Sequence, residues 1–192
     1  MLIKTSEQEK LDPRVKRTRA LIVDAFSALL AHKGFDAISV QDVTAQAEVN
    51  RATFYSHFTD KYALLDYFIS QTFKQELEKR TLNACHYSPA NLRSLVLTLC
   101  EYLANMHSAC AQPHQQFEAL TEGTIKNILF ELLSLWLAQT GPSVSTDIPA
   151  TVATWSIYGL ASYYSHLKKR PPLEEFVDQA IPLVAINLEQ FA

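Results

Sequence analysis

Apolar residues recur three and four positions apart along most of this chain, which is the spacing that places side chains on one face of an α-helix. The first such set comprises Ile22, Ala25, Phe26, Leu29 and Leu30. No stretch of useful length alternates apolar with polar residues, as a half-buried strand would. Only 4 glycines occur in 192 residues, fewer than the turns of an all-β sandwich or a phosphate-binding loop usually need. The sequence therefore predicts an all-α fold.

Composition narrows the class of protein further. Hydrophobic residues make up 48% of the chain, enough to bury a core and too many for a disordered protein. The longest apolar stretch, residues 128–138, is interrupted by Glu131 and is shorter than the roughly 18 residues of a membrane-spanning helix. Residues 1–10 lack the apolar core of an export signal, and an odd count of 3 cysteines suits reduced thiols. We expect a cytoplasmic protein without a membrane partner.

Local signals place the first helix. Asp12 followed by Pro13 predicts an N-cap with proline in the first turn. Gly34 can take the left-handed conformation and predicts the cap at the other end. Residues 1–12 are then expected to form a flexible arm, whose lysines could add phosphate contacts.

Two short helices and a longer one are predicted next. Ser39, with Asp42 three positions on, is the signal of a capped helix start. Asn50 is a good N-cap for a third helix over residues 51–58, so a three-residue turn separates the two short helices. Residues 59–60 cap a fourth helix, which runs to about residue 80 or 82.

The remaining chain is predicted as helices separated by proline-bearing breaks. The first runs from about residue 89 to 106 or 109, the second begins after Pro113 and ends by 141, and the last two cover about 148–168 and 173–191. Gly123 could divide the second of them, which brings the total to about nine helices. We therefore expect a three-helix domain over 13–60 and a helical effector-binding and dimerisation domain over 61–192.

Two short helices joined by a tight turn behind a longer helix form a helix-turn-helix arrangement. The second short helix fits a major groove about 12 Å wide, where its first residues reach base edges while flanking groups hold phosphates. Four of the six residues from 14 to 19 are basic, which is an electrostatic footprint for phosphate or, alternatively, a solvated helix start. The pattern favours a DNA-binding function.

Residues 39–61, SVQDVTAQAEVNRATFYSHFTDK, closely resemble the DNA-binding signature of the TetR family of transcriptional regulators. The matching positions are Ala45, Ala47, Val49, Asn50, Thr53, Tyr55, His57, Phe58 and Lys61. The resemblance covers about residues 14–65. The family usually has glycine where this chain has Glu48, so this residue either adopts a left-handed conformation at some cost or shifts the turn. A carboxylate at this turn, if near DNA, would also oppose binding.

The resemblance implies a set of DNA-binding residues. They are Gln41, Arg51, Ala52, Thr53, Tyr55, His57 and Lys61. Arg51 and Ala52 would approach bases, Gln41 would reach a base or a phosphate, and the other four would contact phosphates. The alternatives are a packing role for Tyr55, a capping role for His57 and an exposed Lys61 without a contact. Phe54, Phe58, Val43 and Ala47 are assigned to the core.

The last two helices look like half of a four-helix bundle completed by a second copy of the chain. The first of them has one apolar stripe at Ala153, Ile157, Leu160, Tyr164 and Leu167. A second stripe of the same spacing holds Val152, Ser156, Gly159, Tyr163 and His166. The interface is expected at Ile157, Leu160, Tyr164, Val177 and Val184. Close helix approach at Gly159 and a kink at Pro182 are also expected. The alternative is a pair of helices buried within one chain; the resemblance implies a homodimer that reads a pseudo-palindromic operator.

The resemblance also implies an enclosed small-molecule effector among the large side chains of the middle helices. The candidates are Tyr102, Met106, Phe117, Trp136, Trp155 and Tyr158, with core packing as the alternative for each. Glu118 and Glu122 would attract a cationic ligand if they face inward and are otherwise solvated acids.

We expect neither a metal nor a cofactor. His107, Cys110 and His114 could be ligands on one helix, but Pro113 breaks the geometry and a fourth ligand is lacking. Cys100 and Cys110 would lie about 15 Å apart on one helix, too far for a disulfide.

An enzyme would need a glycine-rich or acid–base constellation beside these His and Cys residues, and none is found. A protein-interaction module has only Glu48 in its favour. The sequence therefore predicts a ligand-responsive DNA-binding repressor that is not an enzyme.

Overall fold

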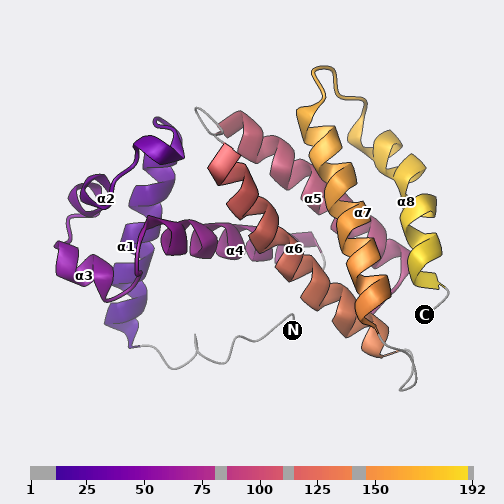
Figure 1. Cartoon of the computed structure of the whole chain (residues 1–192), viewed down its shortest axis with the longest axis horizontal. Coiled ribbons are helices and arrows are strands. Elements are labelled where there is room, and N and C mark those ends of the chain that lie inside the picture. The colour runs from indigo at the N-terminus through magenta and orange to yellow at the C-terminus, as the bar shows by residue number, and fades with distance from the viewer. Residues whose placement is uncertain (1–11, 81–85, 110–114, 140–145, 190–192) are drawn as a thin grey trace. The chain divides into compact units, whose positions relative to one another are not determined.

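The computed structural model describes residues 12–80, 86–109, 115–139 and 146–189 of the chain (Figure 1). Within these ranges there is no strand, and the all-α expectation is confirmed. The elements are α1 (Pro13–Leu30), the 3-10 helix η2 (Phe35–Ala37), α2 (Val40–Gln46), α3 (Arg51–Tyr55), α4 (Lys61–Arg80), α5 (Pro89–Ala109), α6 (Gln115–Ala138), α7 (Asp147–His166) and α8 (Leu173–Glu189). The described part of the chain thus has eight α-helices and one 3-10 turn where about nine helices were expected. No helix in this part is long and apolar enough to cross a membrane.

The chain divides into two compact units. Among the described residues, the N-terminal unit holds 12–71, 108–109 and 115–121, and the C-terminal unit holds the rest. The N-terminal unit therefore extends past the predicted domain boundary at residue 60. Three helices, α4, α5 and α6, contribute residues to each unit.

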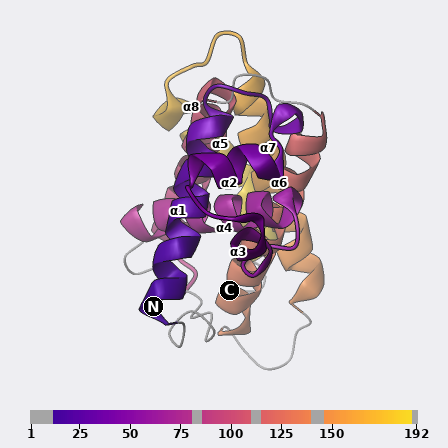
Figure 2. The same ribbon diagram turned by 90° about the vertical axis from the view of Figure 1, so that its left-hand side faces the viewer.

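In the N-terminal unit, α2 packs against α1 and α3 packs against α2, as Figures 1 and 2 both show. Phe26 of α1 is fully buried and meets Phe35 and Phe68 edge-to-face, with ring centroids 6.2 and 5.8 Å apart. The predicted inward residues of the two short helices, Val43, Ala47, Phe54 and Phe58, are all buried. The apolar core therefore fixes how the two short helices are held.

Three of the predicted helix starts are confirmed by their caps. Asp12 accepts a hydrogen bond from the backbone N–H of Arg14 at 2.8 Å, with proline in the first turn. Ser39 and Asp42 form the reciprocal capping box at the start of α2. Asp60 accepts from the backbone N–H groups of residues 62 and 63 at the start of α4.

The predicted left-handed cap at Gly34 is wrong. Gly34 has φ −62° and ψ 147°, and α1 ends at Leu30 with Ala31 in the right-handed region. The carbonyl of Gly34 accepts from the N–H of Ala37, so this residue begins η2 instead of ending α1. The reason is that Phe35 must turn back to reach the core, where it is 1% exposed.

The third helix is shorter than predicted, ending at Tyr55 instead of residue 58. The hydroxyl of Ser56 donates to the carbonyl of Thr53 at 2.7 Å, a local bond that competes with helix continuation. Phe58 still donates its N–H to the carbonyl of Phe54, so the chain turns without losing that bond.

The long helix α6 runs through Gly123 without a break, so the suggested division there is wrong. A glycine costs a helix about 1 kcal/mol. Ile125 and Leu129 are fully buried on the same helix, and their burial outweighs that cost. A side chain added at Gly123 would meet nothing within 4 Å, so packing does not require glycine here.

The helices α7 and α8 lie side by side within the C-terminal unit. The hydroxyl of Tyr164 donates to the carbonyl of Pro171 at 3.1 Å, and its ring packs on Phe176 at 4.9 Å. Four of the five predicted interface residues are buried in this single chain, and Leu160 is partly exposed. The four are Ile157, Tyr164, Val177 and Val184. Burial within one chain leaves these four side chains little surface for a second copy, and their role in a dimer interface stays a prediction.

Cys100 is a buried thiol in α5. Burial raises the pKa of this thiol to about 12, so it stays protonated and unreactive at neutral pH. Cys110 and His114, the further candidates for a disulfide or a metal ligand, lie outside the described residues.

Candidate nucleic-acid interface

The turn between α2 and α3 is closed by a residue in the left-handed region. Glu48 has φ +53°, the sole positive φ among the described non-glycine residues. The next residue, Val49, donates its N–H to the carbonyl of Thr44 at 3.0 Å. Of the two outcomes considered for a non-glycine residue here, the chain takes the left-handed conformation, at a cost of about 1 kcal/mol.

The start of α3 is fixed by its cap. The side-chain oxygen of Asn50 accepts from the backbone N–H of Thr53 at 2.7 Å. This bond sets the direction in which α3 leaves the turn. Arg51, the first residue of the helix, is exposed, as a residue that approaches a base edge must be.

Arg51 and Gln41 are brought together across the turn. The guanidinium Nη2 of Arg51 donates to the side-chain oxygen of Gln41 at 3.1 Å, which links α3 to α2. Two residues predicted to face DNA from different helices thus lie on one surface. A bond of this kind also reduces the rotamer freedom that Arg51 would lose on binding.

Tyr55 lies on the exposed side of α3. Its side chain is 55% exposed, and its ring meets the edge of Phe54 at 5.5 Å between centroids. The alternative of a half-buried packing tyrosine is therefore not supported. Ala52 is also exposed, and Thr53 is partly exposed, so both remain accessible beside Tyr55.

His57 is partly buried at the end of the same segment. Burial lowers the pKa of its imidazole below the ordinary value, and the positive charge of Arg19 lowers this pKa further. The Nδ1 atom is buried without a hydrogen-bond partner. The neutral ring is therefore expected to carry its proton on Nε2, because a proton on Nδ1 would be a buried donor without an acceptor. His57 can therefore offer a neutral N–H donor.

Arg19 of α1 is a residue of this surface to which sequence reasoning gave no individual role. Its guanidinium lies 5.8 Å from the ring centroid of Phe58 and 5.2 Å from that of Tyr67. The stacked position holds the positive charge close to His57. Arg19 belongs to the basic cluster read from the sequence, but contacts to residues 58 and 67 depend on the tertiary fold.

Lys61 has a different environment from the one predicted. Its ammonium donates to the carbonyls of Phe35, Asp36 and Ile38 at 3.2, 3.2 and 3.0 Å. It also lies 4.6 Å from the ring centroid of Phe35. All three of its protons are thus used to hold η2 against the start of α4, and a phosphate contact would require it to leave these carbonyls.

The large side chains predicted to enclose an effector are spread over both units. Phe117 belongs to the N-terminal unit and packs on Phe35, with ring centroids 6.1 Å apart. In the C-terminal unit, Trp136 is buried, whereas Met106 is partly exposed. The hydroxyl of Tyr102 bonds that of Thr72 at 2.7 Å.

Trp155 and Tyr158 lie beside a lysine near the surface of the C-terminal unit. The ammonium of Lys126 is 3.0 Å from the ring centroid of Trp155 and 5.1 Å from that of Tyr158. Glu122 pairs with the same ammonium. The cation expected near Glu122 is therefore a residue of the chain itself.

The helix-turn-helix segment matches a known family. The sequence model described as bacterial regulatory proteins, tetR family, matches residues 22–68. The uncharacterised HTH-type transcriptional regulator YxbF of Bacillus subtilis is 29% identical over 103 residues, which are 52% of this chain and 27% of that protein. The corresponding regulator YdeS of the same organism is 39% identical over 59 residues, 30% of each. The chain thus spans less than a third of the length of these curated relatives.

Solved structures resemble the chain over nearly its whole length. A TetR-family regulator from Streptomyces coelicolor gives a TM-score of 0.64 at 15% identity, covering 93% of this chain and 98% of that one. A TetR transcriptional regulator from Streptococcus agalactiae gives 0.57 at 19% identity, covering 89% and 95%. FadR from Bacillus subtilis, in complex with stearoyl-CoA, gives 0.55 at 15% identity, covering 86% and 96%.

Identities this low show the fold alone, whereas the match over residues 22–68 falls on the segment that carries α2, the strained turn and α3. That segment has its caps satisfied, its apolar residues inward and Arg51 and Tyr55 outward. Residues 22–68 thus match the tetR family of bacterial regulatory proteins, and the chain shares the fold of solved TetR-family structures.

Proposed function

We propose that this chain is a cytoplasmic transcriptional repressor that binds a pseudo-palindromic DNA operator as a homodimer and releases it in response to a small molecule. The observation that carries the proposal is the pairing of Arg51 with Gln41 beside exposed Tyr55 on the capped α2–α3 surface. Such a surface presents donors to base edges and phosphates from a helix short enough for the major groove.

We assign the contacts by chemistry. Arg51, with two parallel N–H donors, reads a guanine edge, and Ala52 approaches the neighbouring base. Thr53, Tyr55 and the neutral N–H of His57 donate to phosphate oxygens, which fixes the register of α3 on the duplex. We assign Lys61 to positioning, because its ammonium holds η2 in place.

The dimer is proposed to form through the exposed apolar face of α7 and α8. Large apolar side chains are exposed there at helical spacing. They are Ile148, Val152, Trp155 and Tyr163 on α7, and Leu183 and Ile186 on α8. Gly159 lies in the same stripe, and a side chain added to it would meet nothing within 4 Å of this chain. A second copy is the occupant we propose, since a patch of this kind on a soluble chain marks an interaction surface.

The effector is proposed to be a small molecule held by the C-terminal unit. FadR of Bacillus subtilis, whose fold this chain shares, was solved with stearoyl-CoA. The identity of 15% carries no ligand across, so the chemistry of the effector is left open. Tyr102, Met106 and Trp136 are the candidate lining residues. We propose no enzymatic activity for the chain.

The test is an in-vitro selection from random duplexes with the purified full chain at two salt concentrations. The proposal expects an inverted repeat to be enriched, with binding that weakens steeply as salt increases. A folded, dimeric protein that enriches no sequence at either salt concentration would contradict it. Enrichment of a single half-site would contradict the proposed homodimer but would still support DNA binding by α3.

A further inference from the structure

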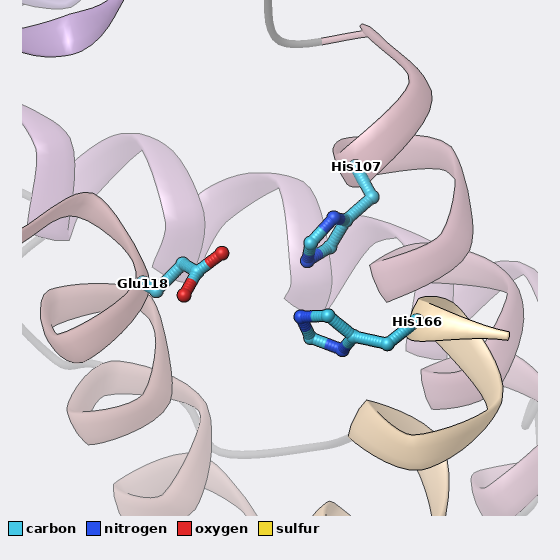
Figure 3. A group of neighbouring side chains, drawn as sticks. All are labelled: His107, Glu118 and His166. Atoms are coloured by element: carbon cyan, nitrogen blue, oxygen red, sulfur yellow. The ribbon is translucent and has the colours of Figure 1, made fainter. Parts of the chain in front are cut away.

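Two histidines from distant parts of the sequence meet in the C-terminal unit. His107 lies in the last turn of α5 and His166 is the last residue of α7. Their ring centroids are 4.2 Å apart with the rings inclined by 70°, and Figure 3 shows the rings turned toward each other. Glu118, also labelled there, belongs to the N-terminal unit. The DNA-binding surface makes no use of this imidazole pair.

The spacing of the ring nitrogens suits a shared metal ion. One nitrogen of each ring lies within 4.8 Å of the other. A tetrahedral ion with metal–nitrogen bonds of 2.0–2.1 Å holds two imidazole nitrogens about 3.3 Å apart. Side-chain rotations that move each nitrogen by less than about 1 Å would bring the two nitrogens from at most 4.8 Å to this separation.

The hydrogen bonding of His166 prepares it to be a ligand. Its Nδ1 lies 2.7 Å from the carbonyl oxygen of Ser162. A carbonyl can only accept, so the proton of the neutral ring is on Nδ1 and the lone pair is on Nε2. Metal-binding histidines commonly donate their second N–H to a backbone carbonyl in this way, which orients the ring and increases its basicity.

The position of the pair at two helix ends favours a cation. Both residues lie in the last turn of their helices, where the aligned peptide dipoles leave partial negative charge. A divalent ion placed between the two rings would interact favourably with both helix ends. The environment is therefore suited to positive charge in addition to the imidazole donors.

We propose that His107 and His166 bind a divalent transition-metal ion, with Zn²⁺ as the first candidate because imidazole nitrogen is a preferred ligand of this ion. Water completes the coordination sphere. The ion joins the end of α5 to the end of α7 within the C-terminal unit and stabilises that unit. The sequence analysis weighed His107 only with ligands along one helix and expected no metal, because the approach of His166 depends on the tertiary fold.

The test is calorimetric titration of the metal-free full chain with Zn²⁺ alone. We expect one ion per chain and a higher midpoint of thermal unfolding with Zn²⁺. His107→Ala and His166→Ala are each expected to lower the affinity by at least about 10-fold. His32→Ala, at an exposed histidine of the N-terminal unit, is the matched control and should leave the titration unchanged. Equal affinity in all four proteins, or no binding to the wild type, would overturn the proposal.

A second measurement does not depend on whether the variants fold. Nitrogen NMR of the wild-type chain with ¹⁵N-labelled histidine is expected to show His166 protonated at Nδ1 before Zn²⁺ is added. Addition of Zn²⁺ should then shift Nε2 of His166 together with one nitrogen of His107. Shifts confined to other histidines would place the ion elsewhere and contradict the proposal.

Discussion

The N-terminal and C-terminal units differ in what determines which side chains are exposed on their surfaces. In the N-terminal unit, the placement of the side chains proposed to face DNA follows from caps and turns within a few residues, such as Asn50 accepting from Thr53. In the C-terminal unit, α7 is apolar on two faces, and only packing against α8 decides which face is covered. A surface that depends on local geometry can therefore be predicted from a short motif, whereas the face of α7 that stays exposed cannot.

The largest change in stability or dimer affinity is expected from two isoleucine-to-alanine substitutions, one at a buried position of α7 and one at an exposed position of α8. Ile157→Ala is expected to lower the free energy of unfolding by about 2–5 kcal/mol, because Ile157 is fully buried within one chain. Ile186→Ala, at a side chain that is 61% exposed, is expected to weaken the dimer by about 10-fold instead. Denaturant unfolding and sedimentation measure the two properties.

The opposite pattern would support the interface predicted from the sequence over the exposed face proposed above. If Ile157→Ala weakened the dimer and left the unfolding of the monomer unchanged, the buried stripe would be the true interface.

A smaller change in stability is expected from a substitution at Lys61. The role of holding η2 in place and the role of contacting a phosphate make opposite predictions for this residue. Lys61→Met removes the donor of three carbonyls and should lower the free energy of unfolding by about 1–3 kcal/mol. The salt dependence of DNA binding should stay as it is in the wild type. A salt slope reduced by about 1 with unchanged stability would instead identify Lys61 as a phosphate contact.

A substitution in the turn between α2 and α3 is expected to stabilise the chain. Glu48→Gly removes the strain of a positive φ and should increase the free energy of unfolding by about 1 kcal/mol. Glu48→Gln keeps the strain and removes the charge, so it separates the two effects. If Glu48→Gly gave no increase in stability, the strain argument would fail, and a gain in DNA affinity shared with Glu48→Gln would be due to charge.

The smallest effect concerns pH. Hydrogen bonds from the Ser39 hydroxyl and N–H, and then from Lys33, lower the pKa of Asp42 to about 2. Because the folded pKa lies below the ordinary 3.8, the stability that Asp42 contributes is complete above about pH 4 and is lost as the pH falls toward 2. Asp42→Asn should flatten the stability profile in this range, measured by thermal unfolding. An unchanged profile would show that the cap is not coupled to folding.

The sequence predicted the helical class, the caps at Asp12, Ser39 and Asn50, and the core positions of the two short helices. These features depend on residues two to four positions apart, so a pattern suffices to predict them. The cap at Gly34 failed because the path of the following residues is set by where Phe35 finds the core.

Other features could not be predicted, because they join residues distant in sequence. Lys61 bonds carbonyls more than twenty positions away, and His107 meets His166 across the C-terminal unit. Burial of the predicted interface stripe within one chain could not be foreseen for a related reason, since both stripes of α7 have the same helical spacing. A pattern of spacing cannot show which of two apolar faces another helix will cover.

The most direct test of the central claim is a fluorescence anisotropy titration with the selected duplex. Wild-type chain is compared with the double variant Arg51→Ala, Tyr55→Phe, after circular dichroism and sedimentation show that both are folded and in the same oligomeric state. We predict that the double variant binds at least about 10-fold more weakly and discriminates less between operator and random duplex. Equal affinity and equal discrimination in the two proteins would contradict the claim that α3 reads DNA.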